Sequence, residues 1–457
     1  MSRDLVFADY AMATLIALVL FVVYNANGRE IPTYDSQPTK FAARELLLRG
    51  TLSLNYVVGG TPQFIERAGF QLARDGRYRS AYSPVPAVAA ATIIWPFSTA
   101  GLIDIRESRA PNLIAALASS MMVALAVGLT YLTARRRLSS GRAVMLAAAL
   151  GLGTGLWSTA SQTLWQHETA ILGLSMAVFG LCAIRRPQTQ SPGDPMWRRV
   201  ALGLLIGVGL GLAIGSRQQL APSAAVLAVA ALAMGGWRCG LAASSVAVAL
   251  VVPVWLANLR WFGSVLGAAP MLEALHDTVH ATSGTFSLSS GGFLGLIFSP
   301  NRGLVVFSPV VAVVVVALPG ILRATWSSPL PWCAVAAMLQ FVLYASYVVW
   351  WGGHTYGPRY MLDVLPLLIP LAIVAMKRIQ GRALPLLATA SLVWSVGVAG
   401  LGAFVYPHER WNTDPADVDR NHERLWDWSD MQIRRCLTAG ASPQNYSLVP
   451  VIVDEER

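Results

Sequence analysis

The stretch VFADYAMATLIALVLFVVY, residues 6–24, decides the class of this protein because it is long and apolar enough to cross a bilayer. A membrane-spanning helix needs ~20 mostly apolar residues. Comparable stretches recur along the chain, in which 55% of the 457 residues are hydrophobic and only 13% are charged. This composition excludes a soluble protein and predicts an all-α polytopic membrane protein.

The same criterion, with a few short segments allowed, predicts about eleven transmembrane helices. They cover residues 6–24, 111–132, 143–157, 169–184, 200–216, 220–236, 241–259, 304–322, 330–351, 362–376 and 383–405. A twelfth apolar stretch, residues 84–103, contains three prolines, which weaken a simple span, so we expect an interfacial or re-entrant helix there. A full span, which would place the N-terminus outside, stays open as the alternative.

The charge pattern predicts how the chain is oriented, because Lys and Arg gather in cytoplasmic loops. Alternate short loops, together with the N-terminus, hold 14 basic and three acidic residues, whereas the rest of the chain holds 20 basic and 21 acidic residues. We therefore expect a cytoplasmic N-terminus and a transmembrane domain over residues 1–405. The extracytoplasmic parts would be the loops 25–110 and 260–303 and the C-terminal tail 406–457. The net charge of +10 reports this topology and does not indicate a nucleic-acid partner.

Ionisable residues are rare inside the predicted spans and cluster at the ends that face outward. They include His167 and Glu168 in LWQHE, Arg217 in GSRQQ, and His354, Arg359 and Asp363 in WWGGHTYGPRYMLD. Transporters usually place substrate sites near the membrane midplane, so this location favours an enzyme acting on a lipid headgroup. A lipid or small-molecule transporter, such as a flippase, remains the alternative function. For Arg359 alone the alternative is a snorkelling side chain in an aromatic belt, and for His167 alone it is a buried, hydrogen-bonded histidine.

The first predicted outer loop contains YDSQPTKFAARELLLRGTLSLN, residues 34–55. Its apolar residues can lie in the lipid boundary of an interfacial helix, while Lys40, Arg44 and Arg49 point toward headgroups. An ordinary amphipathic connector is the alternative. Farther along, Tyr82 stands in YSPVPA at the start of the proline-rich stretch.

These segments resemble those of membrane-embedded glycosyltransferases of the GT-C superfamily, in the bacterial group akin to protein O-mannosyltransferases and lipid A aminoarabinose transferases. The similar stretches are YDSQPTKFAARELLLRGTLSL (34–54), LWSTASQTLWQH (156–167), FSPNRGLVVFSP (298–309) and WWGGHTYGPRYMLDVLP (350–366). The resemblance implies a sugar donor carried on polyprenyl phosphate and an acidic catalytic residue soon after the first span. Asp35 matches that position. Many relatives have a paired Asp-Glu there, whereas this chain has Asp35-Ser36.

The resemblance therefore predicts an inverting transfer of a sugar to an acceptor hydroxyl at the outer face of the bacterial inner membrane. The acceptor would be a cell-envelope glycan, a lipid or a protein. The predicted catalytic residues are Asp35, as the base, and Glu168, as a second carboxylate matched by location only. The predicted cations for the donor phosphate are Arg359, Arg217, Lys40 and Arg44. The predicted contacts to sugar or acceptor are His167, His354, Tyr356 and Tyr82. A divalent metal held by His167, Glu168 and His354 stays open, because their spacing matches no known ligand pattern.

Overall fold

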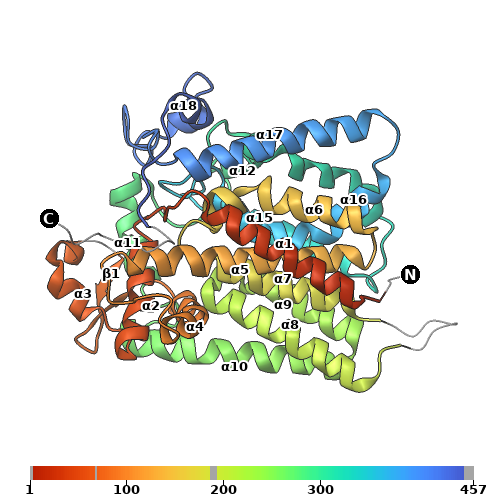
Figure 1. The fold of residues 1–457 in the computed structure, drawn as a ribbon, viewed down its shortest axis with the longest axis horizontal. Helices are drawn as coiled ribbons and strands as arrows, with labels where there is room; N and C mark the ends of the chain where they lie inside the picture. Colours follow the sequence, from red (N-terminus) through yellow and green to blue (C-terminus); the bar gives the residue numbers. More distant parts are fainter. Residues whose placement is uncertain (1–3, 67–68, 186–192, 447–457) are drawn as a thin grey trace, which may run out of the picture.

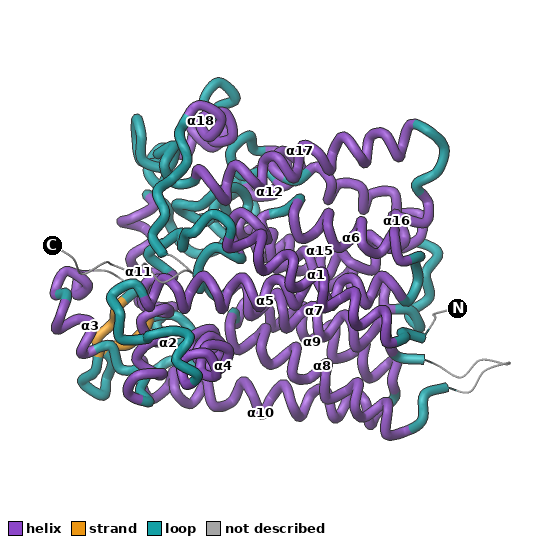
Figure 2. The backbone as a smooth tube through the Cα atoms, viewed as in Figure 1, coloured by secondary structure: helices purple, strands orange, loops and turns teal. Residues whose placement is uncertain are grey.

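The long apolar segments form helices that lie side by side in one bundle (Figure 1). The computed structural model describes residues 4–66, 69–185 and 193–446. A helix satisfies its backbone N–H and C=O groups within its own segment, which is why apolar sequence without water adopts it. Most of the loops lie at the two ends of the bundle (Figure 2).

The secondary structure is almost entirely helical. The α-helices are α1 (Phe7–Asn25), α2 (Ser36–Arg49), α3 (Asn55–Gly60), α4 (Val85–Thr99), α5 (Ala110–Arg135), α6 (Ser140–Leu152), α7 (His167–Ala183), α8 (Met196–Ser216), α9 (Ala221–Gly235), α10 (Trp237–Phe262), α11 (Ala269–His280), α12 (Gly292–Phe298), α13 (Leu304–Phe307), α14 (Leu318–Ile321), α15 (Pro329–Ser346), α16 (Ile369–Arg378), α17 (Ala383–Val405) and α18 (Gln432–Thr438). Short 3₁₀ or π segments are η1 (Pro62–Glu66), η2 (Leu156–Ala160), η3 (Gln218–Leu220), η4 (Pro309–Ala317), η5 (Arg359–Leu368) and η6 (His422–Trp426). Strands β1 (Phe70–Leu72) and β2 (Tyr78–Ser80) pair antiparallel, with Phe70 opposite Ser80.

Eight helices in the described part of the chain are long and apolar enough to cross a membrane. They correspond to eight of the eleven predicted spans: α1, α5, α8, η3 with α9, α10, α15, η5 with α16, and α17. The other three predicted spans, 143–157, 169–184 and 304–322, are also helical, but their helices are shorter. The all-α, multi-pass class is thus confirmed, while three segments differ from the simple spans expected.

Two of these differences have a visible cause. Helix α6 ends at Leu152. A Cβ on Gly153 would lie 2.7 Å from the Ala149 carbonyl oxygen, so the backbone conformation that ends the helix requires glycine at this position. In 304–322, Pro309 cannot donate a helical hydrogen bond, and the following run of valines has low helix propensity. This segment therefore splits into α13, η4 and α14.

The proline-rich stretch 84–103 forms α4, which has 15 residues and is therefore ~22 Å long, shorter than the hydrocarbon core of a bilayer. Figure 1 shows α4 end-on, whereas α5, α8 and α10 run across the view. It packs on α2 and α5 at one end of the bundle. This helix is shorter than a simple span, and whether it lies at a membrane interface stays a prediction.

Contacts between distant segments show which loops share an end of the bundle. Asp9 near the start of α1 pairs with Arg135 at the end of α5 at 2.8 Å, and Arg136 donates to the carbonyl of Cys182 at the end of α7. The N-terminal segment and these basic turns therefore lie together, as alternate-loop charge requires. We call this the basic end. Which side of a membrane it faces stays a prediction.

At the opposite end, part of the tail packs on the loops between the helices. Arg302, whose side chain is fully buried, donates to the carbonyl oxygens of Trp351 (3.0 Å) and Gly353 (3.1 Å) and to the Asn412 side chain (2.7 Å). A guanidinium has five fixed donors, so one residue can join three segments in this way. The loop that precedes η5 is thereby held against the tail.

Candidate active site

Asp35 and Arg359 meet at the end of the bundle opposite the basic end, although 324 residues separate them in sequence. Arg359 Nη1 donates to Asp35 Oδ2 at 2.8 Å, and the Tyr82 hydroxyl donates to Asp35 Oδ1 at 2.9 Å. The Asp35 side chain is 31% exposed and that of Arg359 is 14% exposed, so the pair can be reached from outside. Three of the residues predicted from sequence are therefore in direct contact.

The position of Asp35 depends on a buried network beneath the loop that follows α1. Asp35 is the residue before α2, and Lys40, on the first turns of that helix, pairs with Glu30 at 2.9 Å and donates to Asn112 at 2.8 Å. Thr163 donates to the same Glu30 carboxylate. These contacts tie both sides of Asp35 to α5 and to the segment before α7.

The position of Arg359 depends on a tight turn in the WWGGHTYGPRY segment. Gly352 has a φ of +77°, and a Cβ there would lie 2.9 Å from Arg359 Nε. Only glycine adopts this backbone without strain and leaves room for the guanidinium. Arg302 binds the carbonyls on either side of Gly352, which holds the turn in place.

Aromatic rings surround the Arg359 guanidinium. Its Cζ lies 4.7 Å from the centre of the Trp165 ring and 5.4 Å from the centre of the Tyr360 ring. Cations are attracted to the faces of such rings, and a guanidinium stacked in this way keeps its edge donors available. Arg359 is thus presented as a fixed cation whose hydrogen-bonding edge faces Asp35.

A second, buried cluster is built around Asp363, which lies on η5 four residues after Arg359. Arg217 Nε lies 2.9 Å from Asp363 Oδ2, and the Tyr344 hydroxyl donates to this oxygen at 2.5 Å. His167 Nδ1 lies 2.9 Å from Asp363 Oδ1, and Arg217 Nη1 lies 3.1 Å from His167 Nε2. Because arginine can only donate, His167 accepts at Nε2 and donates at Nδ1, which describes a neutral imidazole. The negative charge of Asp363 is balanced by Arg217.

The electrostatics of the Asp35–Arg359 pair keep Asp35 ionised. Burial alone would raise the pKa of the Asp35 carboxyl, but the charge of Arg359 and the hydrogen bonds from Tyr82 and Arg359 outweigh it and lower the pKa below its usual value. For Tyr82, burial and then the charge of Asp35 raise the pKa well above that of a free phenol. At neutral pH Asp35 is therefore a carboxylate and Tyr82 a neutral donor.

Several predicted site residues make contacts that favour structural roles. Lys40 is 2% exposed and is held in the Glu30 network, and Arg44 donates to the carbonyls of Ile105 and Arg106 at 2.9 Å each. The Tyr356 hydroxyl donates to the Val398 carbonyl at 2.9 Å, which places its ring against α17.

Two more predicted residues lie elsewhere. Glu168 is fully buried in the first turn of α7, where the positive end of the helix dipole favours an acidic side chain. His354 faces the tail and lies 2.9 Å from Asp417. Among the described residues, His354, Asp417 and Asp419 are the group placed to hold a metal ion. The metal set considered from sequence, His167, Glu168 and His354, is not that group.

The sequence prediction missed Asp363, Tyr344 and Trp165 as site residues. Asp363 had a signal, because it is an acid inside an apolar span and follows Arg359 by four residues, and such an acid needs a cationic partner. Tyr344 and Trp165 had none, since aromatic residues are common at membrane boundaries.

An apolar cavity of about 270 Å³ lies between α6, η4, α16 and α17. Its lining is mainly aliphatic, with Arg142 toward the basic end. A smaller pocket lined by Arg359 and Pro358 shares Thr154 and Leu365 with this cavity. The pocket beside Arg359 therefore borders the apolar cavity.

Comparison with solved structures identifies the fold. The chain is similar to ArnT from Cupriavidus metallidurans, solved bound to undecaprenyl phosphate, with a TM-score of 0.52 and 18% sequence identity over 91% of this chain and 67% of that one. No protein-family model and no curated protein sequence matches the chain. The likeness confirms the GT-C-like, polytopic all-α fold that the resemblance predicted.

Proposed function

We propose that this protein is an inverting glycosyltransferase that moves a sugar from a polyprenyl-phosphate donor to an acceptor hydroxyl, at the extracytoplasmic face of a bacterial inner membrane. The observation that carries the proposal is the Asp35–Arg359 pair, a reachable carboxylate 2.8 Å from a cation that also lines a pocket sharing Thr154 and Leu365 with the apolar cavity. A base, a phosphate ligand and a space for a lipid chain are what this reaction needs together.

In the proposed reaction the acceptor oxygen attacks the anomeric carbon of the donor sugar. The acceptor C–O bond forms while the bond from that carbon to the phosphate oxygen breaks, which inverts the configuration. Asp35 takes the acceptor proton, because a neutral hydroxyl is a poor nucleophile. The bond electrons leave with the phosphate, and polyprenyl phosphate is released with increased negative charge. Tyr82 keeps Asp35 oriented through its hydrogen bond.

Arg359 is the proposed ligand of the donor phosphate. A guanidinium can grip two phosphate oxygens at once, and the rings of Trp165 and Tyr360 hold it in place. The lipid chain would enter the apolar cavity between α6, η4, α16 and α17, where burial of CH₂ groups contributes ~0.8 kcal/mol each. The structural likeness to a protein bound to undecaprenyl phosphate supports this class of donor.

The ion pair seen here implies an order of events. Without donor, Arg359 holds Asp35 and lowers its basicity. A phosphate that binds Arg359 competes for the same guanidinium edge, releases Asp35 and places negative charge beside it. Both effects raise the affinity of Asp35 for a proton. Donor binding would thus activate the base.

The other residues receive supporting roles in this proposal. Arg217 and His167 both bind Asp363, so in this proposal they support the site from beneath and Arg359 is the residue that contacts the phosphate. Lys40 and Arg44 fix the first outer loop. Glu168, Tyr356 and His354 are not assigned to the chemical step.

The test is turnover by the purified full-length protein in detergent or nanodiscs. Undecaprenyl-phosphate sugars with different sugar units would be incubated with envelope glycan, lipid or peptide acceptors, and release of undecaprenyl phosphate would be measured. Release that depends on Asp35 supports the proposal. Movement of intact donor across a vesicle membrane without cleavage would instead indicate the transporter alternative.

A further inference from the structure

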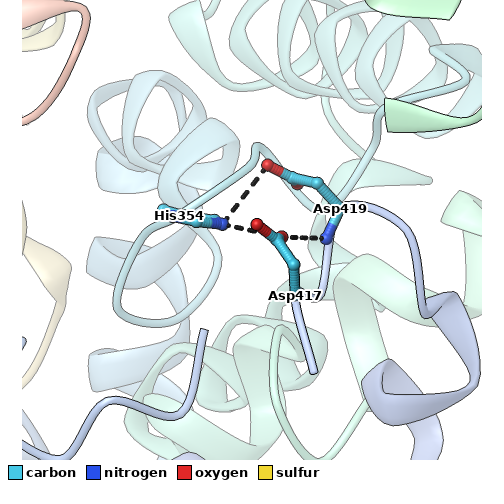
Figure 3. Close-up of side chains that lie close together, drawn as sticks. All are labelled: His354, Asp417 and Asp419. Atoms are coloured by element: carbon cyan, nitrogen blue, oxygen red, sulfur yellow. Dashed lines mark hydrogen bonds and ion pairs between the residues drawn. The ribbon is translucent and has the colours of Figure 1, made fainter. Parts of the chain in front are cut away.

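A third polar cluster is formed by His354, Asp417 and Asp419 (Figure 3). His354 belongs to the WWGGHTYGPRY segment, whereas both aspartates belong to the tail beyond α17. His354 Nε2 lies 2.9 Å from Asp417 Oδ1 and 3.5 Å from Asp419 Oδ2. One candidate ligand atom from each of the three residues lies within 4.8 Å of the others.

These separations suit a shared metal ion. Ligands bound at ~2.1 Å in a tetrahedral site lie about 3.4 Å from one another, which is close to the two N–O separations. One imidazole and two carboxylates form a mixed nitrogen and oxygen set, which suits Zn²⁺ or Mn²⁺. The two carboxylates would also balance the charge of a divalent ion.

Asp419 is held in place by residues outside the cluster, as metal-binding carboxylates usually are. The Trp351 indole N–H donates to Asp419 Oδ1 at 2.7 Å, and His280 Nδ1 lies 3.2 Å from the same oxygen. The Asp419 side chain is only 10% exposed. The Asp419 amide in turn donates to Asp417 Oδ1 at 2.9 Å. A fixed, mostly buried carboxylate costs less ordering entropy on metal binding than a free surface aspartate.

We propose that His354, Asp417 and Asp419 bind a divalent transition-metal ion, Zn²⁺ or Mn²⁺, which fastens the tail to the loop that carries Arg359. The ion would act as a cross-link, since Asp419 also contacts α11 through His280 and His354 lies five residues before Arg359. This site is independent of the proposed transferase activity, because none of its ligands contacts the reacting groups.

Direct binding of the metal to full-length protein tests the proposal. Chelator-treated protein would be titrated with ZnCl₂ and with MnCl₂ in a calorimeter, and the metal bound after dialysis would be counted. We expect one saturable site per chain for at least one of the two metals. His354→Gln and Asp417→Asn should each weaken it by about 10- to 100-fold. Both side chains are partly exposed, at 31% and 48%, so these variants should still fold.

Two matched variants provide the control. His408→Gln and Asp414→Asn remove exposed residues of the same kinds from the same tail and should leave metal affinity unchanged. Melting temperatures in chelator should be alike for all four variants, whereas added metal should raise that of the parent and of the controls only. No saturable site in the parent, or equal affinity in His354→Gln, Asp417→Asn and both controls, would overturn the inference.

Discussion

Replacing Asp35 by Asn should slow sugar transfer by about 10²- to 10⁴-fold, the usual contribution of a general base. The same change should leave the affinity for undecaprenyl phosphate unchanged or slightly higher. The carboxamide of the Asp35→Asn variant could not take a proton, but it would also stop competing for the guanidinium of Arg359, which now lies 2.8 Å from Asp35 Oδ2. A base is expected to give a slower rate with unchanged or tighter lipid binding, whereas a lipid-binding residue would give weaker binding, so the two measurements distinguish these roles.

The size of the second effect follows from the exposure of the pair. Asp35 is 31% exposed and Arg359 is 14% exposed, and partly exposed ion pairs contribute up to ~1 kcal/mol. The donor must break this pair to reach Arg359, and ~1 kcal/mol corresponds to about a five-fold change in affinity. The affinity of Asp35→Asn for undecaprenyl phosphate should therefore lie between that of the parent and a value about five-fold higher.

Two assays on the same preparations check this prediction. Release of undecaprenyl phosphate from a glycosylated donor gives the rate, and titration with undecaprenyl phosphate itself gives the affinity without knowledge of the sugar. Asp104→Asn, which removes an exposed acid between α4 and α5, is the matched control and should change neither value. A parental rate in Asp35→Asn would refute the base assignment. Clearly weaker lipid binding would refute the competition between Asp35 and phosphate.

Three other predictions concern the same end of the bundle. Arg359→Gln should weaken undecaprenyl phosphate binding by about 10- to 100-fold, the equivalent of ~1.5–3 kcal/mol for hydrogen bonds to a charged group, as measured by the same titration. Without donor, Arg359 and Tyr82 hold the pKa of Asp35 below its usual value, so kcat/KM should fall only at acid pH below the usual carboxyl range. Bound phosphate raises this pKa, so kcat should fall at a higher pH than kcat/KM does. Acid limbs at the same pH in the two profiles would contradict this. Arg302→Met should destabilise the protein by about 3 kcal/mol or more, because it leaves buried acceptors at Trp351, Gly353 and Asn412 unpaired. Thermal unfolding in detergent measures this effect, and an unchanged midpoint would show that these bonds are unimportant.

The helical fold was predictable from sequence because hydrocarbon leaves the backbone few alternatives. Where helix bounds differ from the predicted spans, local sequence and packing are the reason. Residues 143–157 read as one apolar span, but the backbone at Gly153 passes too close to the Ala149 carbonyl for any side chain, and α6 stops before it. The hydropathy of residues 304–322 predicted one span. Pro309 and the valine run that follows it instead give a 3₁₀ helix in the middle of this segment.

The residues of the candidate site were predicted in part. Asp35, Tyr82 and Arg359 were predicted as members of one site, and the structure brings them together. Lys40 and Arg44 looked equally suitable, since a cation in an outer loop carries the same signal whether it meets a ligand or a neighbouring carboxylate. The contacts of Lys40 with Glu30 and of Arg44 with two carbonyl oxygens are properties of the folded loop.

Sequence by itself determined that this chain forms membrane helices and that its charged groups collect at the ends of the bundle. Both follow from solvation, which acts on each residue or segment separately. Tertiary structure alone decided that Asp35 faces Arg359 and that Arg217 faces Asp363. A pairing between segments hundreds of residues apart depends on how the whole bundle packs, and no local pattern in the chain encodes that distance.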